Sequence, residues 1–354
     1  MEKHSSRKWI VSFFALVLAL VLLVSATVFV IDPFFQFRVK DNSYKLSAWF
    51  VSSGLIENYD YDTLIIGSSV TQNFNMDVFR EELGAAPLHI GLSGIRPIEM
   101  KQMMQAAYDA GKADTYYLCV DTSFFTEPEQ PSRYPQYLLK DDIFSRLRYF
   151  FSYEVWFRYI PVNLGLMVLD LLNFELPQKY EYSKSVDRLE DWSMNQSFGE
   201  EYVLDGYGKP SLDGMTADTD ALYAEMISKI DTFLADFDYE NGQHVFFFPP
   251  YSALYWSELE YIDKIDSILL AKQYFIEKAN ELGAKVYDFQ AAEFTVELNN
   301  YSDIQHYSPE INDWMTRQFG QSEYVVTAQN CVEFQERLHN NTRMFMEKYV
   351  HLFR

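Results

Sequence analysis

The sequence predicts an α/β protein with a mainly parallel five-stranded sheet covered by helices on both faces, a three-layer α/β/α arrangement. Short apolar runs rich in β-branched and aromatic residues recur along the chain, and most stop at a glycine, proline or aspartate. Stretches with helical periodicity separate the runs. Strands that alternate with helices are typical of right-handed βαβ units, and strands buried on both faces are continuously apolar.

We predict five strands and the helices that connect them. The strands are Thr63–Ile66, Pro87–Ile90, Thr115–Val120, Gln243–Phe248 and Ala284–Phe289. The expected helices are 77–83 with Gly84 as C-cap, one ending near 110, one over about 258–282, and a terminal amphipathic helix over 330–354. The strands and their helices define one domain over 61–325, followed by a C-terminal helix over 326–354.

The amino terminus predicts a membrane anchor. Residues 9–31 contain no charge and are long enough to cross a bilayer, and three basic residues precede them. The positive-inside rule then places residues 1–8 in the cytoplasm as a tail. Residues 32–60 form a juxtamembrane connector with a short helix over 44–55. A cleaved signal peptide would have a shorter apolar core and a small-x-small site. We therefore expect a single-pass cell-membrane protein with an extracytoplasmic domain.

Composition excludes several functional classes. The formal net charge is -22, so nucleic acid is not an expected partner. The two cysteines, Cys119 and Cys331, are too few for a disulfide framework or a structural metal site. No second histidine or cysteine stands at ligand spacing beside His306. We therefore expect neither a metal nor another cofactor.

A long excursion separates the third and fourth strands, over about residues 126–214. Prolines punctuate its apolar pieces, and it has no strand–helix rhythm of its own. A loop of that length is unusual inside a compact domain, so we expect a mostly helical cap inserted at the crevice. The segment 164–169 is too short for a second membrane span, which leaves open a patch that faces the membrane or a partner.

The first chemically informative stretch is Leu64–Gln72, where the first strand ends in Gly67, Ser68 and Ser69. In open α/β sheets, ligands bind at the carboxyl ends of the strands. A hydroxyl in such a turn can point into the crevice beside backbone N–H groups, which is the geometry that a serine nucleophile needs. The alternative is a turn serine that only hydrogen-bonds its own loop.

The second informative stretch follows the last strand and contains Asp303 and His306, with Ser308 as the N-cap and Pro309 as the first residue of the next helix. An aspartate three residues before a histidine can hold one imidazole nitrogen. The other nitrogen is then available to take a proton from a serine. The alternative is helix capping beside a surface histidine. Of the six histidines, only His306 has a carboxylate in such a setting.

These stretches resemble sequence blocks of the SGNH/GDSL hydrolase superfamily. The run Gly67-Ser68-Ser69-Val70-Thr71 resembles the Gly-Asp-Ser block, with Ser68 where the aspartate usually stands. The run Ile90-Gly91-Leu92-Ser93-Gly94 resembles the second block, and Asp303-x-x-His306 resembles the terminal block. The three blocks keep their order and their spacing relative to the strands over about residues 61–320.

The resemblance implies a flavodoxin-like SGNH fold and assigns roles to the residues. Ser69 would be the nucleophile, His306 the general base and Asp303 the residue that orients the imidazole. The backbone N–H groups of Ser69 and Gly94 would form an oxyanion hole.

The chain departs from the superfamily after the third strand. The usual Gly-x-Asn-Asp block is replaced there by residues 121–125, which contain no asparagine, so Thr122 or Ser123 would have to replace its amide donor. Together with the amino-terminal span, this departure is similar to a membrane-anchored branch that includes alginate O-acetylation proteins and the D-alanyl transfer protein of teichoic acid synthesis. That resemblance implies an acylated cell-surface glycan as substrate and a multi-span membrane O-acyltransferase as a partner.

The sequence therefore predicts a membrane-anchored, extracytoplasmic serine esterase or O-acyltransferase that acts on acyl groups of cell-surface polysaccharide through a Ser-His-Asp triad. A second hypothesis is a catalytically inactive SGNH-fold scaffold or glycan-binding partner of a membrane acyltransferase. The missing asparagine favours the second hypothesis, and the Asp303–His306 pair favours the first.

Overall fold

The computed structural model divides into two compact units. Unit 1 consists of Met1–Tyr59 and Tyr134–Ser185, and unit 2 consists of Asp60–Arg133 and Val186–Arg354. The structure describes residues 2–40, 44–186, 196–208 and 219–353. The expected insertion at 126–214 is thus shared between the units, and its residues 187–195 and 209–214 lie outside the described residues, as do residues 41–43 of the connector and the two terminal residues.

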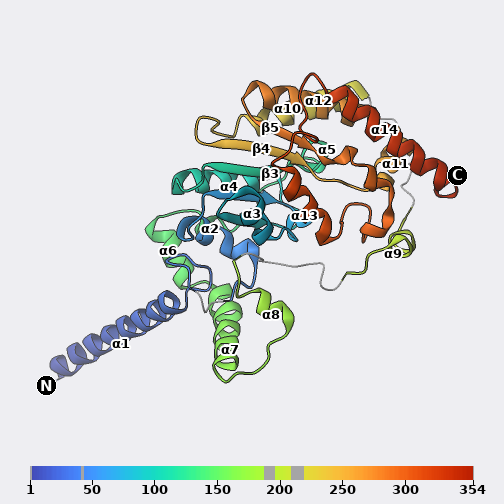
Figure 1. Cartoon of the computed structure of the whole chain (residues 1–354). Helices are drawn as coiled ribbons and strands as arrows, with labels where there is room; N and C mark the ends of the chain where they lie inside the picture. Colours follow the sequence, from blue (N-terminus) through green and yellow to red (C-terminus); the bar gives the residue numbers. More distant parts are fainter. Residues whose placement is uncertain (1, 41–43, 187–195, 209–218, 354) are drawn as a thin grey trace. The chain divides into compact units, whose positions relative to one another are not determined.

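Unit 2 contains a five-stranded sheet in which every strand pairs in parallel with its neighbours, as predicted (Figure 1). The strands are β1 (Thr63–Gly67), β2 (Pro87–Gly91), β3 (Thr115–Cys119), β4 (Gln243–Phe248) and β5 (Lys285–Asp288). Their order is β2-β1-β3-β4-β5. This is the order of flavodoxin-like doubly wound sheets, in which ligands bind where the order reverses, at the carboxyl ends of β1 and β3.

Helices of unit 2 pack on both faces of the sheet. The helices of the described part of unit 2 are α3 (Met76–Leu83), α4 (Pro97–Ala110), α5 (Ser123–Thr126), α9 (Glu200–Asp205), α10 (Thr219–Leu234), α11 (Ala253–Tyr261), α12 (Ile265–Glu281), α13 (Pro309–Gln318) and α14 (Cys331–Lys348). On one face the ring of Tyr117 in β3 contacts Phe79 of α3 and Phe319 at the end of α13. On the other face Phe246 of β4 contacts Phe233 of α10 and Phe275 of α12. Neighbouring strand residues point to opposite faces, so aromatic packing covers both.

The predicted helix ends are confirmed at two positions, the end of α3 and the start of α13. Gly84 follows α3 with φ of 64°, the left-handed conformation that favours glycine as a C-cap. Pro309 is the first residue of α13, and Ser308 precedes it in an extended conformation as the N-cap.

The prediction of one helix over 258–282 is wrong. The chain forms α11 and α12 instead, and between them Asp263 has φ of 55°. A non-glycine residue in the left-handed region ends a helix, but no glycine or proline marks the break in the sequence. The break lets α11 pack against α14, whose Phe345 lies in the core of unit 2.

A buried ion pair joins α12 to β5. The Nζ atom of Lys272 lies 2.6 Å from Oδ2 of Asp288 and donates to Oε1 of Gln290 at 2.7 Å. Burial lowers the pKa of Lys272, and the negative charge of Asp288 opposes that shift. The two charged side chains are only 4% and 2% exposed, so neither can recover hydration if the other is removed.

Lys272→Met is therefore expected to lower the free energy of unfolding by about 3–5 kcal/mol, because it leaves the Asp288 carboxylate buried without its cation. The measurement is chemical or thermal unfolding of the full chain in detergent. Lys278→Met is a matched control on the same helix, since Lys278 is 40% exposed and pairs with Glu281 at the surface. Its loss should stay within about 1 kcal/mol. Equal losses in the two variants would contradict the expectation.

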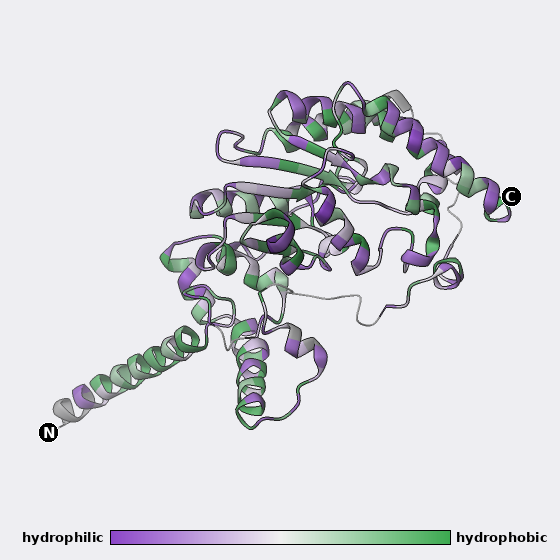
Figure 2. Ribbon diagram, in the orientation of Figure 1, coloured by the Kyte–Doolittle hydropathy of each residue, from purple (hydrophilic) through white to green (hydrophobic). Residues whose placement is uncertain are grey.

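Unit 1 is helical in its described part. It contains α1 (Glu2–Ile31), α2 (Ala48–Asn58), α6 (Ile143–Phe150), a π-helical turn (Glu154–Tyr159), α7 (Ile160–Leu171) and α8 (Gln178–Tyr182). The segment Arg7–Ile31 is long and apolar enough to cross a membrane, judged by length and composition (Figure 2). The connector helix α2 begins and ends a few residues later than the predicted 44–55.

Candidate active site

The turn that carries Ser69 has room for only glycine at its first position. A Cβ atom on Gly67 would lie 2.4 Å from Cγ2 of Thr71 and 2.8 Å from Cβ of Cys119. The Thr71 hydroxyl donates to the carbonyl of Ser68 at 2.8 Å, which closes the turn. The strand can therefore reverse tightly at its carboxyl end and present the next residue, Ser69, to the cavity.

Side-chain amides fix this turn to neighbouring elements. Gln72 donates through Nε2 to the carbonyl of Gly91, the last residue of β2, at 3.2 Å. Asn312 of α13 donates through Nδ2 to the carbonyl of Val70 at 3.0 Å. Because α13 follows the loop that carries His306, the second bond ties the serine turn to the histidine loop.

The histidine loop is organised around one carboxylate. Oδ1 of Asp303 accepts the backbone N–H groups of Gln305 at 2.8 Å and His306 at 2.7 Å. Ser252 donates its backbone N–H and its hydroxyl to the carbonyl of Ile304 at 3.1 and 2.8 Å. The loop therefore has a defined conformation, although Asp303 itself is half exposed.

Ser69, His306 and Asp303 form a continuous hydrogen-bonded relay. The Oγ atom of Ser69 lies 2.7 Å from Nε2 of His306, and Nδ1 of His306 lies 2.7 Å from Oδ2 of Asp303. Burial alone would raise the pKa of Asp303, but the hydrogen bond and charge of His306 outweigh it and lower that pKa. An ionised carboxylate only accepts, so Nδ1 carries the proton and Nε2 is the acceptor for the serine hydroxyl.

The relay opens into a cavity of about 830 Å³ whose walls include Ser69, Gly94, Asp121, Ser123 and His306. This volume lies in the range of small-molecule sites. The cavity lies at the carboxyl ends of β1 and β3, where the strand order reverses. The three residues predicted for catalysis are thus brought together, and the predicted oxyanion residue Gly94 lies in the wall of the same cavity.

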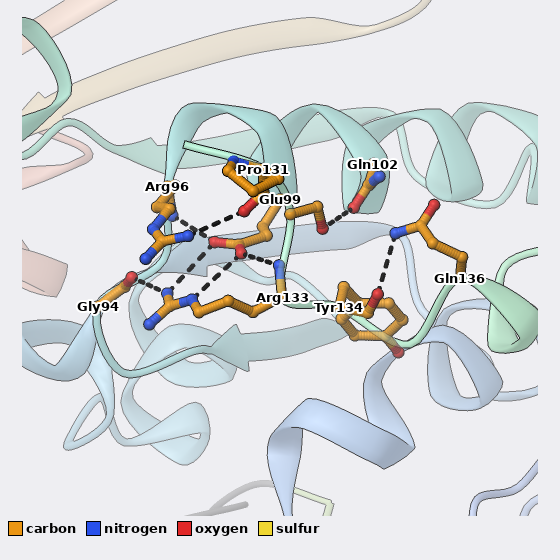
Figure 3. Close-up of polar contacts among 9 residues, drawn as sticks. Gly94, Arg96, Glu99, Gln102, Pro131, Arg133, Tyr134 and Gln136 are labelled. Carbon is orange, nitrogen blue, oxygen red and sulfur yellow. Dashed lines mark hydrogen bonds and ion pairs between the residues drawn. The ribbon is translucent and has the colours of Figure 1, made fainter. Parts of the chain in front are cut away.

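A buried carboxylate holds the loop that carries Gly94 (Figure 3). Oε2 of Glu99 accepts the backbone N–H of Arg96 at 2.8 Å, and Oε1 accepts the backbone N–H of Arg133 at 2.7 Å. The guanidinium of Arg133 also donates to Glu99 and to the carbonyl of Gly94. Gly94 has φ of 60°, in the left-handed region that favours glycine, and the bonds to Arg133 hold the turn in that conformation.

The two residues predicted to replace the asparagine of the Gly-x-Asn-Asp block have different positions. The hydroxyl of Thr122 is hydrogen-bonded to that of Tyr255, and Thr122 is buried. Ser123 lines the cavity at the start of α5. Of the two, only Ser123 lines the same cavity as Ser69 and Gly94.

Asp121 is a site residue that the sequence did not single out. It lies two residues after the end of β3 in the cavity wall, and its carboxylate accepts the hydroxyl of Tyr251 and bonds with the side chain of Ser68. Burial raises the pKa of Asp121, against the opposing effects of Tyr251, Ser68 and the nearby His306. Its position after a strand could have identified Asp121 as a site residue. Its partner Tyr251 could not be identified in that way, because it lies far away in the sequence.

Asp121→Asn is expected to stabilise the protein increasingly as pH rises. The pKa of Asp121 is higher in the folded chain than in the unfolded chain, where an aspartate has a pKa of about 3.9. Ionisation of Asp121 therefore lowers the free energy of unfolding at pH values above about 3.9. Asparagine cannot ionise, so the difference in melting temperature between variant and natural chain should grow from about pH 4 through the folded pKa and then level off. A difference that stays constant between pH 4 and pH 8 would contradict this account.

No protein-family model matches this chain, and no curated protein matches its sequence. The class of the site is therefore defined by its geometry. A serine hydroxyl, an imidazole and a carboxylate joined in series can move a proton from the serine while the serine attacks an electrophilic carbon. The site thus has the geometry that a serine nucleophile requires, with an imidazole beside the hydroxyl and a carboxylate that orients the imidazole.

Proposed function

We propose that this protein is a membrane-anchored serine esterase or O-acyltransferase of the SGNH type, acting on acyl groups of cell-surface polysaccharide. The observation that carries the proposal is the relay of two 2.7 Å contacts from Ser69 through His306 to Asp303. The strand order and the cavity at the strand ends support the SGNH assignment, since they place the serine where doubly wound folds bind ligands.

The reaction begins when Oγ of Ser69 attacks the carbonyl carbon of an ester. Nε2 of His306 takes the hydroxyl proton, and Asp303 stabilises the imidazolium that forms. The tetrahedral intermediate collapses, the C–O bond to the leaving alcohol breaks, and His306 returns the proton to that alcohol. A water molecule or a glycan hydroxyl then attacks the acyl-serine, with His306 acting again as base and then as acid.

The backbone N–H groups of Ser69 and Gly94 supply the oxyanion donors in this proposal. Loss of one such donor costs roughly 10²–10³ in turnover in other serine hydrolases. Ser123 supplies the third donor in place of the missing asparagine, since it lies in the cavity wall at the end of β3. Asp121 lines the same cavity, and its negative charge when ionised opposes the oxyanion but stabilises the imidazolium of the nearby His306.

The helix α1 anchors the domain in this proposal, with residues 1–8 in the cytoplasm according to the positive-inside rule. Unit 2 then lies on the extracytoplasmic side, where acylated cell-surface glycans are available. A multi-span membrane O-acyltransferase is the partner that would deliver the acyl group if transfer rather than hydrolysis is the reaction.

The second candidate is an inactive SGNH-fold scaffold or glycan-binding partner of a membrane acyltransferase. The chain after β3 favours it, because residues 121–125 contain no asparagine. The relay argues against it, because glycan binding alone does not require a serine held against an oriented imidazole.

The test mixes the full chain in detergent with p-nitrophenyl acetate and follows nitrophenol release. We expect a burst equal to the concentration of chain, followed by slower turnover, with an acetyl group on the chain at the end of the burst. Addition of short glycans then separates the two activities, because acetylated glycan marks transfer and free acetate marks hydrolysis. A chain with the expected circular dichroism, but without a burst or a mass increase, would favour the scaffold.

A further inference from the structure

Unit 1 exposes far more apolar surface than the rest of the molecule, even apart from α1. Fourteen large apolar side chains are exposed between Ile143 and Phe174, whereas the described part of unit 2 exposes six. Those with the clearest exposure include Phe144, Phe157 and Leu171. We call the exposed apolar side chains of 143–174 the α6–α7 surface. So many exposed large apolar side chains in one segment are unusual for a protein surface in water.

The α7 helix shows this most clearly. Residues 160–169 contain no charge, and α7 buries only Ile160, Asn163 and Leu166. Met167, Val168 and Leu169 are exposed, as are Leu171 and Leu172, and hydrophobic residues extend along the helix in Figure 2. An amphipathic helix of a soluble domain would have polar residues on its exposed side.

The α6–α7 surface is fixed to the end of the candidate membrane span. Asp32, the residue after α1, is buried and accepts the backbone N–H of Phe37 and the hydroxyl of Tyr149 in α6 at 2.9 and 2.8 Å. The ring of Phe34 packs edge-on against Tyr159 at the start of α7. Accordingly α1 packs against both α6 and α7. The α6–α7 surface is therefore held next to the C-terminal end of α1, where the apolar segment ends.

The two units also differ in net charge, and the difference favours unit 1 as the one that contacts lipid. Without the cytoplasmic tail of residues 1–8, unit 1 contains nine Lys and Arg residues and nine Asp and Glu residues, whereas unit 2 contains 17 and 41. A surface close to neutrality can approach anionic lipid headgroups that would repel unit 2. Exposed Arg148 and Arg158 lie among the apolar residues, where long basic side chains reach headgroups.

We propose that α6 and α7 lie in the lipid interface of the leaflet from which α1 emerges, as a second membrane contact that does not span the bilayer. With 12 residues, α7 is about 18 Å long, too short to cross. The occupant of the α6–α7 surface is thus the lipid bilayer itself. This contact orients unit 1 at the membrane, independently of the chemistry at Ser69, and it requires only that α1 spans.

The test uses the full chain in vesicles of phosphatidylcholine and phosphatidylglycerol that contain doxyl-labelled lipid. An environment-sensitive fluorophore is attached to a single introduced cysteine, with the natural chain as the labelling blank because Cys119 and Cys331 are buried. Met167→Cys and Leu171→Cys report on the surface. Met344→Cys is the matched control, since Met344 is an exposed methionine of unit 2, and Leu20→Cys reports on α1.

We expect the doxyl lipids to quench most of the fluorescence at positions 167, 171 and 20, and little at position 344. Suppose that position 20 is quenched but that positions 167 and 171 are quenched no more than position 344. This result would overturn the interfacial contact and leave the anchor in place. Disulfide formation between copies of the unlabelled Met167→Cys chain, without lipid quenching of the labelled chain, would also overturn the interfacial contact, because the surface would then face a second copy. No quenching at position 20 would overturn the anchor and this contact together.

Discussion

Ser69→Ala is expected to lower the rate of ester cleavage on the order of 10⁶-fold, the loss found when the nucleophile of a serine hydrolase is removed. The Oγ atom of Ser69 is the atom 2.7 Å from Nε2 of His306, and alanine has no oxygen to place there. The remaining rate would come only from binding and from the oxyanion donors. The measurement is kcat/KM with p-nitrophenyl acetate.

The neighbouring serine provides the matched control for that variant. Ser68 is buried, and its side chain bonds with Asp121 rather than completing the relay. Ser68→Ala should keep the burst of nitrophenol that Ser69→Ala loses. If Ser68→Ala abolished the burst and Ser69→Ala kept it, the assignment of the nucleophile would be wrong.

Asp303→Asn is expected to lower the rate of acylation about 10⁴-fold, because the substitution inverts the protonation of His306. Oδ1 of Asp303 accepts two backbone N–H groups, from Gln305 and His306, while Oδ2 faces Nδ1 of the imidazole. An asparagine would keep its one oxygen on the two backbone donors, so its amide N–H would point at Nδ1. The imidazole would then carry its proton on Nε2 and could not accept one from Ser69.

A second aspartate–histidine pair serves as control for Asp303→Asn. Asp266 lies 3.6 Å from Nε2 of His339, and the Asp266 side chain is 84% exposed. Asp266→Asn should leave both the rate and the melting temperature unchanged, since an exposed pair of this kind contributes little. A rate for Asp303→Asn within tenfold of the natural chain would show that the orientation of His306 does not depend on this carboxylate.

Much of the sheet and of the relay could be predicted from the sequence, because both depend on local patterns. Each strand is a short apolar run that ends at turn residues, so β1 and β2 were located within a residue of their observed ends. Ser69 follows such a strand directly. Asp303 and His306 are close in sequence, and the turn that joins them is a local structure.

The parts that could not be predicted depend on contacts between distant residues. The break between α11 and α12 occurs at Asp263, which adopts positive φ without glycine or proline nearby. The packing of residues 134–185 with the connector depends on contacts such as Tyr149 with Asp32. The Glu99–Arg133 support of Gly94 and the Tyr251–Asp121 bond likewise join separate segments. Local periodicity carries no information about such partners.

The central claim is that Ser69 is a nucleophile activated by His306, and a covalent adduct tests it most directly. The full chain in detergent is treated with a fluorophosphonate, which forms a bond to an activated serine oxygen with loss of fluoride, and the peptide masses are measured. The relay predicts one adduct, on Ser69, which disappears in His306→Ala. An unmodified Ser69 in a folded chain, or an adduct that forms equally fast without His306, would contradict the claim.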